Sequence, residues 1–210
     1  KDFKGKEIVV PFRADMPDIV LKQLIKKQGF DIKKDFKIKY VASPIDAMQM
    51  LILRRADNVL LIEPAASMAL RKTKSFPAKL IAPELYRSVD LQKEWGKTFN
   101  TADKIPQAGI AAIGDIIKNE KVKKRFLEEH GKSLKWYKQN PKEAAIMAAN
   151  EFPMLKAQAV EDSIPNVRLE NISAKNSKKS LTLFFNILKK DTPKSIGGKL
   201  PDDNFYYGTN

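Results

Sequence analysis

The sequence predicts an α/β protein in which a parallel sheet flanked by helices is followed by a mainly helical part. In the first seventy residues, short apolar runs alternate three times with amphipathic stretches of helical length. Strands joined through helices must run parallel, with right-handed crossovers. After residue 115 the helical period dominates. We therefore expect an α/β lobe over residues 1–115 and a mainly helical segment over residues 116–210.

The first strand and helix are bounded by clear turn signals. Residues 7–11 (Glu-Ile-Val-Val-Pro) form a short apolar run typical of a buried strand. A loop follows, and residues 17–27 carry apolar side chains at helical spacing, with Gly29 as the stop. Pro17 suits the start of this helix because its φ is fixed and it has no N–H to leave unpaired.

The next two strand–helix pairs follow the same logic. Residues 36–41 and 58–62 are predicted strands. Ser43 and Pro44 begin a helix that runs to about Arg54, with Ser43 as the cap and Pro44 in the first helical position. A further helix is expected from Ala65 to Arg71.

The remaining chain is predicted to be largely helical, with three more strand candidates. An exposed helix capped by Asp90 is expected over residues 90–99, and a last helix over residues 178–189. Helices should fill residues 116–159, with breaks near Gly131 and at Asn140-Pro141, where Asn140 is the expected cap. The strand candidates are residues 79–82, 107–113 and 167–169.

Composition excludes several classes of function. The chain has 210 residues and no cysteine, so disulfides, thiolate metal sites and cysteine nucleophiles are excluded. Its one histidine, His130, cannot build the usual zinc or serine–histidine–acid sites alone. We therefore expect no metal, no cofactor and no catalytic residue. No apolar run is long enough to span a bilayer.

The net charge of +14 invites a nucleic-acid interpretation, but its distribution argues against one. The lysines are spread along nearly the whole chain, on polar positions of amphipathic segments. Aromatic residues are not interleaved with them as base-stacking platforms would require. We therefore expect no nucleic-acid partner, and keep a basic interaction domain as the weaker alternative.

Three places could contact a ligand, because ligands of parallel sheets bind beyond the carboxyl ends of the strands. The first is the loop and helix start of residues 13–18. There Arg13 could pair with an anion, while the aspartates could instead cap the helix. The second is Glu63-Pro64, where a carboxylate could also simply match the helix dipole. The third is residues 107–109, whose small side chains would admit a ligand or allow close packing.

The same residues resemble the ABC-transporter solute-binding proteins of the nitrate, sulfonate and thiamine-precursor group. No single motif carries the resemblance; the ordered set does, over almost the whole chain. Its parts are Gly5-Lys6 before the first strand, the loop of residues 13–18, Ser43-Pro44-Ile45-Asp46-Ala47, residues 57–65 ending in Glu63-Pro64-Ala65, the helical stretch 123–152, and the tail 196–207.

The resemblance implies a type II periplasmic-binding fold, with the helical C-terminal part belonging to the other lobe. It also implies that a first-lobe segment is missing before residue 1. The implied function is a monomeric receptor, periplasmic or cell-surface and in some cases lipid-anchored. It would capture a small molecule in a cleft and deliver it to an ABC permease. The ligand-binding residues would be Arg13, Ala14, Asp15, Met16, Asp18, Glu63, Pro64, Gln107 and Gly109.

Two alternatives stay open. Relatives of this group are enzymes of thiamine-pyrimidine synthesis or of desulfination, but those need a reactive histidine or cysteine near the cleft. The single histidine here lies away from both cleft loops. A sensor module of the same fold is the other alternative. The sequence does not name the ligand: Arg13 suggests an anion, whereas Met16 and Pro17 also suit a flat heteroaromatic.

Overall fold

The computed structural model describes residues 1–80 and 84–208 and divides into two compact units. Unit 1 consists of Lys1–Asp103 and Lys138–Arg168, and unit 2 consists of Lys104–Tyr137 and Leu169–Asn210. The predicted domain boundary near residue 115 stays a prediction. Each unit is described by itself below.

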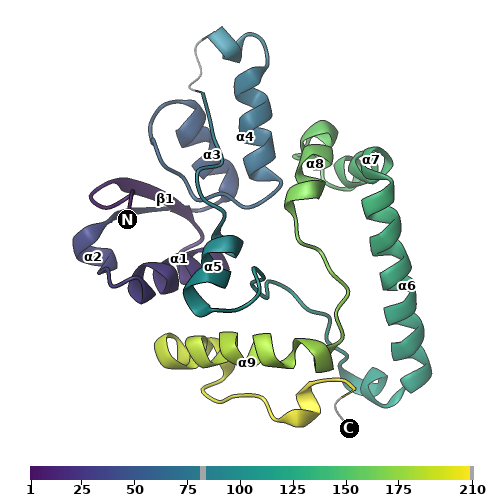
Figure 1. The fold of residues 1–210 in the computed structure, drawn as a ribbon. Helices are drawn as coiled ribbons and strands as arrows, with labels where there is room; N and C mark the ends of the chain where they lie inside the picture. Colours follow the sequence, from purple (N-terminus) through teal and green to yellow (C-terminus); the bar gives the residue numbers. More distant parts are fainter. Residues whose placement is uncertain (81–83, 209–210) are drawn as a thin grey trace. The chain divides into compact units, whose positions relative to one another are not determined.

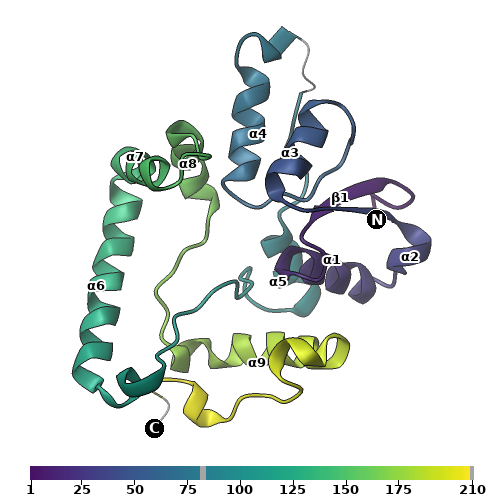
Figure 2. The same cartoon turned by 180° about the vertical axis from the view of Figure 1, so that it is seen from behind.

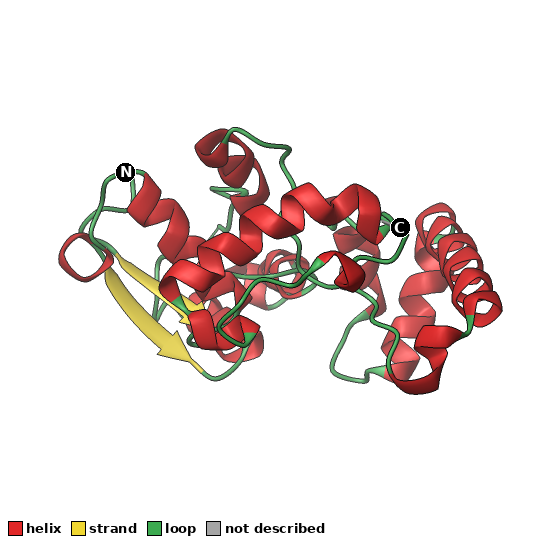
Figure 3. Ribbon diagram, turned by 90° about the horizontal axis from the view of Figure 1, so that it is seen from below, coloured by secondary structure: helices red, strands yellow, loops and turns green. Residues whose placement is uncertain are grey.

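Unit 1 is built on a small parallel sheet (Figures 1 and 3). Strands β1 (Glu7–Pro11) and β2 (Lys37–Val41) pair in parallel, with Val10 opposite Tyr40. Helix α1 (Met16–Lys27) connects them, followed by the single turn α2 (Ile32–Asp35). The predicted α/β class is therefore confirmed for this part of the chain.

The predicted third strand, residues 58–62, pairs for less than its expected length. Val9 and Val59 form one parallel bridge, supported by the bonds Val9 N–H to Asn58 O (2.9 Å) and Leu60 N–H to Val9 O (2.8 Å). Ile62 is already an exposed apolar residue. The chain thus leaves the sheet before Glu63, although its direction along the sheet is as predicted.

Two apolar clusters pack on opposite faces of β1, because successive side chains of a strand alternate in direction. Ile8 and Val10 pack with Ile25 of α1 and with Phe36. Val9 packs with Ala47 on the opposite side. A strand buried on both faces reads as a continuous apolar run, as Ile-Val-Val does here.

The helices of unit 1 mostly begin and end where the sequence predicts. Helix α3 (Pro44–Ile52) starts at the Ser43 cap, whose hydroxyl accepts a bond from Asp46 N–H, and α4 spans Ala65–Lys74. Helix α5 (Leu91–Phe99) is capped by Asp90, but it is not the exposed helix expected: Trp95 is 1% exposed and its ring lies tilted against that of Phe99, with centroids 4.2 Å apart. Burial of a large aromatic side chain such as Trp95 holds the helix against the protein, although most of its other residues are polar.

Helices α7 (Pro141–Glu151) and α8 (Ala157–Ser163) complete unit 1 and pack against each other (Figure 2). The chain breaks at Asn140-Pro141 as predicted. Asn140 occupies the cap position of α7 without a side-chain capping bond.

Unit 2 is helical and contains the larger part of α6 (Glu120–Gln139) and all of α9 (Ala174–Asp191). The predicted break at Gly131 is wrong, because α6 continues through it. A glycine inside a helix costs only about 1 kcal/mol. Here its missing side chain leaves room for Asn171, whose Nδ2 would lie 2.8 Å from a Cβ. The apolar residues of the last helix, namely Leu181, Phe184, Phe185, Ile187 and Leu188, predict its buried face, and Phe184 and Leu188 are indeed buried.

Within the described residues, the other three strand candidates form no strand. Lys79 and Leu80 belong to a 3₁₀ turn, and residues 81–82 lie outside the described residues. Residues 107–113 and 167–169 have no regular secondary structure. A strand needs a neighbouring strand to bond with, and none lies beside these segments within the described residues.

No helix in the described ranges 1–80 and 84–208 is long and apolar enough to cross a membrane.

Candidate functional site

The carboxyl ends of β1, β2 and the segment after Val59 lie along the same edge of the sheet, because all three run parallel. Helices α1, α3 and α4 each begin shortly after one of these ends. Helix starts present unpaired N–H groups and partial positive charge, which favours anions and polar ligand atoms. This edge is therefore the candidate site predicted from the sequence.

The loop between β1 and α1 has a strained backbone. Phe12 (φ 56°) and Ala14 (φ 64°) adopt the left-handed region, which costs a non-glycine residue roughly 1–2 kcal/mol. Strain of this kind persists only where surrounding contacts impose it. Two bonds do so here: Phe12 N–H donates to Val41 O (3.1 Å), and Ala14 N–H donates to the carboxylate of Asp18 (2.7 Å).

Asp18 is the centre of this loop and has no exposed surface. Besides the Ala14 N–H, its carboxylate accepts bonds from Lys22 Nζ (2.6 Å) and from the hydroxyl of Tyr40 (3.0 Å). Burial acts to lower the pKa of Lys22, but the hydrogen bonds and charges of Asp18 and Tyr40 outweigh it and raise that pKa. The carboxylate of Asp18 is thus occupied by these three bonds. Its role in the predicted site is to hold the loop in place.

Arg13 rests on the ring of Tyr40, with its guanidinium carbon 5.4 Å from the ring centroid. Lys22 Nζ lies at the same distance from that centroid. The Tyr40 ring therefore positions two cationic side chains. One of them, Lys22, is already paired with Asp18. The Arg13 side chain is exposed, and within the described residues it forms no ion pair.

Asp15 and Met16 lie at the start of α1. Asp15 caps the helix, and its carboxylate accepts the N–H of Met16 at 2.7 Å. The capping interpretation therefore holds for Asp15, although an exposed carboxylate keeps further acceptor positions. Met16 is half-buried beside it.

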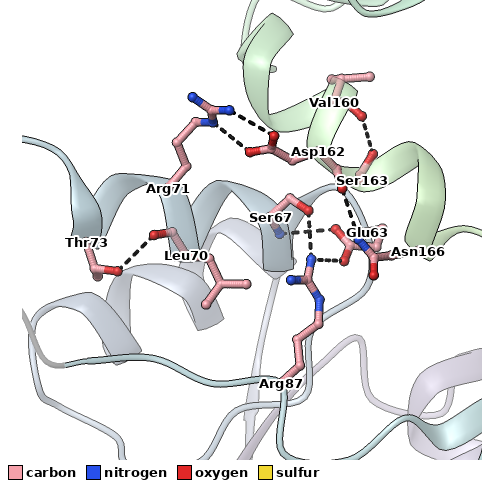
Figure 4. A network of polar contacts seen from close by, with 10 residues as sticks. All are labelled: Glu63, Ser67, Leu70, Arg71, Thr73, Arg87, Val160, Asp162, Ser163 and Asn166. Atoms are coloured by element: carbon pink, nitrogen blue, oxygen red, sulfur yellow. Dashed lines mark hydrogen bonds and ion pairs between the residues drawn. The ribbon is translucent and has the colours of Figure 1, made fainter. Parts of the chain in front are cut away.

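Glu63 and Pro64 lie at the start of α4, in a network that Figure 4 shows. Glu63 accepts the backbone N–H of Ser67 (3.1 Å) and pairs with Arg87 (2.6 Å), which also donates to the Ser67 hydroxyl (2.8 Å). Ser67 is 2% exposed. The carboxylate predicted to face a ligand is thus neutralised by Arg87 and matched to a helix start.

A second pair in this network joins α4 to α8. Arg71 donates two bonds to the carboxylate of Asp162, at 2.7 and 2.8 Å (Figure 4). The bond from Arg71 holds the pKa of Asp162 below its usual value, and the same bond raises the pKa of Arg71. Both side chains remain nearly half exposed, so the pair fixes geometry more than it adds stability.

Gln107 and Gly109 belong to unit 2, in an exposed segment without regular structure. The small-residue strand on which their ligand role rested is absent. Their role as ligand contacts stays a prediction.

His130 lies within α6, four residues after Phe126, whose ring it faces with centroids 6.2 Å apart. Its Nδ1 atom is buried without a hydrogen-bond partner in the described structure. The break predicted near Gly131 would place His130 at a helix end, and this is wrong, because α6 continues past it. Across the described ranges, no three His, Cys, Asp or Glu residues gather as metal ligands would.

A hollow of about 420 Å³ lies at the opposite end of β1 from the candidate site. Residues 54–58 line it together with Lys6 and Glu7. Cations and carboxylates are mixed on its walls, so it carries no preference for one sign of charge. The carboxyl edge, with an unmatched guanidinium, is the stronger candidate.

Sequence reasoning missed the residues that hold the predicted ones in place, namely Tyr40, Lys22 and Arg87. The four-residue spacing of Asp18 and Lys22 was a usable signal, because such pairs meet on one helix face. Nothing in the local sequence marks Arg87, which reaches Glu63 from a segment 24 residues away.

Comparison with known proteins gives a fold match only. No protein-family model matches the chain, and no curated protein matches it. The structure is similar to a crystal structure of an ABC transporter from Parabacteroides distasonis, with a TM-score of 0.78 and 22% identity. The match covers 98% of this chain and 67% of that chain. The chain therefore shares the α/β fold of that structure.

Proposed function

We propose that this chain is the larger part of a solute-binding receptor of an ABC importer, located in the periplasm or at the cell surface. It would bind a small anion or anionic heteroaromatic and present it to a membrane permease, without catalysing a reaction. The fold match supports the transporter association. The observation that carries the ligand class is the exposed guanidinium of Arg13, ordered on Tyr40 at the carboxyl edge of the sheet.

The chemistry of this edge favours a carboxylate, sulfonate or phosphate group. A guanidinium presents several N–H donors in one plane and so matches such groups with two bonds. Its ordering on Tyr40 reduces the side-chain entropy lost on binding. The start of α1 adds partial positive charge next to it.

The experiment is a thermal-shift screen on the full natural protein against sulfonates, nitrate, bicarbonate, thiamine pyrimidines and short carboxylates. A ligand at a hundredfold excess over its Kd adds about 2.7 kcal/mol to the stability, which a shift in Tm reports. Arg13→Ala should weaken the best ligand about ten- to hundredfold, because a charge-assisted bond is lost. Arg13→Lys should recover part of the affinity.

Arg55→Ala is the matched control, because Arg55 is an exposed arginine at the hollow on the opposite end of the sheet. It removes the same charge and should leave the ligand shift unchanged. No ligand in the panel at millimolar concentration, together with salt-sensitive binding to nucleic acid, would refute the receptor proposal.

A further inference from the structure

Helix α6 is one unbroken helix with two contrasting sides (Figure 1). Leu127, Gly131 and Leu134 lie on a partly buried side, where Asn171 Nδ2 donates to Leu127 O at 3.3 Å. The opposite side is exposed. Its residues recur every three or four positions, so they form one continuous row on the helix surface. We call this row the outer face of α6, and its members are Val122, Arg125, Phe126, Glu129, Lys132 and Trp136.

The outer face carries three large apolar side chains. Val122 is 46% exposed, Phe126 51% and Trp136 43%. Val122 and Phe126 are four residues apart and therefore neighbours on the helix surface. Phe126 keeps its exposure although one side of its ring faces His130. At 1.5 Å per residue the row spans about 21 Å. Apolar side chains aligned along one helix face, in contrast to single scattered ones, indicate an interaction surface.

Cations flank the apolar side chains along the helix. Arg125 and Lys132 belong to the outer face itself. Lys121 lies one turn before Arg125. Lys135 lies about one turn after Lys132. The charge of Lys132 is offset by Glu129, to which it bonds at 2.9 Å. Within the described residues, Lys121, Arg125 and Lys135 form no ion pair, so their charges are available to an anionic partner.

We propose that the outer face of α6 docks on a bilayer surface that contains anionic phospholipids. A helix that carries tryptophan and phenylalanine beside lysine and arginine can lie in the plane of such an interface, with its apolar side chains between the headgroups. Tryptophan favours this interfacial region. The cations lie along the surface and pair with the lipid phosphates, while their apolar stems cover hydrophobic area. The inference is independent of which ligand the carboxyl edge binds.

Charge and apolar exposure together select this partner. Residues 118–138 contain eight lysines and arginines against three glutamates, so the partner is anionic. A second copy of the chain would bring like charges together. A nucleic acid would satisfy the cations, but its phosphate backbone offers no cover for Val122, and base stacking uses aromatic rings. An anionic bilayer presents phosphates and apolar lipid chains at one surface.

Vesicle binding tests the proposal with the full natural protein, expressed without lipid modification. Vesicles of phosphatidylglycerol mixed with phosphatidylcholine should sediment the protein at about 0.15 M salt, and vesicles of phosphatidylcholine alone should not. The fluorescence of Trp136 should shift to shorter wavelength on binding, and Trp136→Phe should remove that shift. No sedimentation with the anionic vesicles would overturn the proposal. Binding to double-stranded DNA without binding to vesicles would also overturn it, and would assign the face to a nucleic acid.

Matched double substitutions test where the protein docks. Lys121→Gln with Arg125→Gln should weaken binding to the anionic vesicles about 25-fold, since each cation near such a surface contributes about fivefold. Lys33→Gln with Lys34→Gln removes two exposed lysines from unit 1 and changes the net charge equally. This control should leave the affinity within about twofold of wild type. Equal losses in the two double variants would show that only net charge acts, against the proposal.

A second pair of variants tests the apolar part of the outer face. Phe126→Gln should weaken vesicle binding about tenfold, because it removes apolar area from the interface. Phe152→Gln is the control, since Phe152 is 60% exposed at the end of α7 in unit 1. Binding is measured well below the Tm of each variant, so that both are folded. Unchanged affinity of Phe126→Gln would refute docking through the outer face.

Discussion

The hydroxyl of Tyr40 donates a 3.0 Å hydrogen bond to the buried carboxylate of Asp18, while the ring of the same Tyr40 lies against Arg13. One side chain thus joins the interior anchor of the loop to its exposed cation. The bond links β2 to α1 across 22 residues of sequence. The position of Arg13 depends on the pairing of β2 with β1, because that pairing places Tyr40 beside the loop.

Replacing Asp18 should destabilise the protein strongly. Asp18→Ala removes three bonds to a fully buried carboxylate and leaves Lys22 and the Ala14 N–H without their partner. Leaving buried donors without their acceptor costs about 1–3 kcal/mol each, and the Lys22 side chain, which is 35% exposed, can be partly rehydrated. Urea unfolding measures the loss. Asp15→Ala is the control, because it removes an exposed cap and should cost only about 1 kcal/mol.

Two substitutions of Tyr40 should separate its two roles. Tyr40→Phe keeps the ring under Arg13 and removes the bond to Asp18, so it should lower the stability by about 1 kcal/mol and leave ligand affinity nearly unchanged. Tyr40→Leu removes the ring, so it should weaken ligand binding as well. Calorimetric titration with the best ligand of the screen decides this. Equal affinities of the two variants would show that the ring does not order Arg13.

Arg87 and Glu63 should show a measurable coupling. Each single substitution, Arg87→Ala or Glu63→Gln, loses the 2.6 Å ion pair, and the contribution of that pair is not lost a second time in the double variant. A double-mutant cycle should therefore give a coupling of about 1 kcal/mol. Additive effects, with no coupling, would mean that the pair does not hold the start of α4. Ligand affinity is expected to change little, since Glu63 is already engaged.

The Arg71–Asp162 pair should make stability depend on pH in the acid range. The pKa of Asp162 in the folded protein lies below its usual value of 3.8, because Arg71 bonds to the ionised carboxylate. The pair therefore contributes fully above the unfolded pKa, and the contribution disappears as pH falls through the folded pKa.

The difference in unfolding free energy between wild type and Arg71→Ala should accordingly be present at pH 6 and vanish at the acid end. Because both side chains are nearly half exposed, the difference should also shrink with added salt. Arg55→Ala is the control and should show no such pH dependence. A difference that persists unchanged at low pH would mean that Arg71 acts through packing alone.

Much of unit 1 could be predicted because its signals are local. The Ile-Val-Val run marks β1, and the Ser43-Pro44 start marks α3, since capping and φ restriction act within a few residues. Trp95 shows the limit of that reasoning. A helix with a single buried aromatic looks exposed in composition, because burial depends on what packs against it.

The sequence predicts where the candidate residues lie in the fold, but not which side chains hold them in place. Arg13 and Glu63 were found because the carboxyl ends of parallel strands are fixed by topology. Their partners Tyr40 and Arg87 are selected by three-dimensional proximity, which no local pattern encodes. The prediction of a strand at residues 107–113 is wrong for a similar reason. An apolar run forms a strand only where a neighbouring strand accepts its hydrogen bonds, and the local pattern does not show whether one is there.

The contact between α4 and α8 affects how the protein can be divided. The two helices pack against each other, and each carries a buried alanine, Ala69 on α4 and Ala159 on α8. The Arg71–Asp162 pair joins them across 91 residues of sequence. A fragment cut after Asp103 would strip α4 of this cover. A minimal domain that folds alone should therefore combine Lys1–Asp103 with Lys138–Arg168. A designed linker would replace residues 104–137 between them.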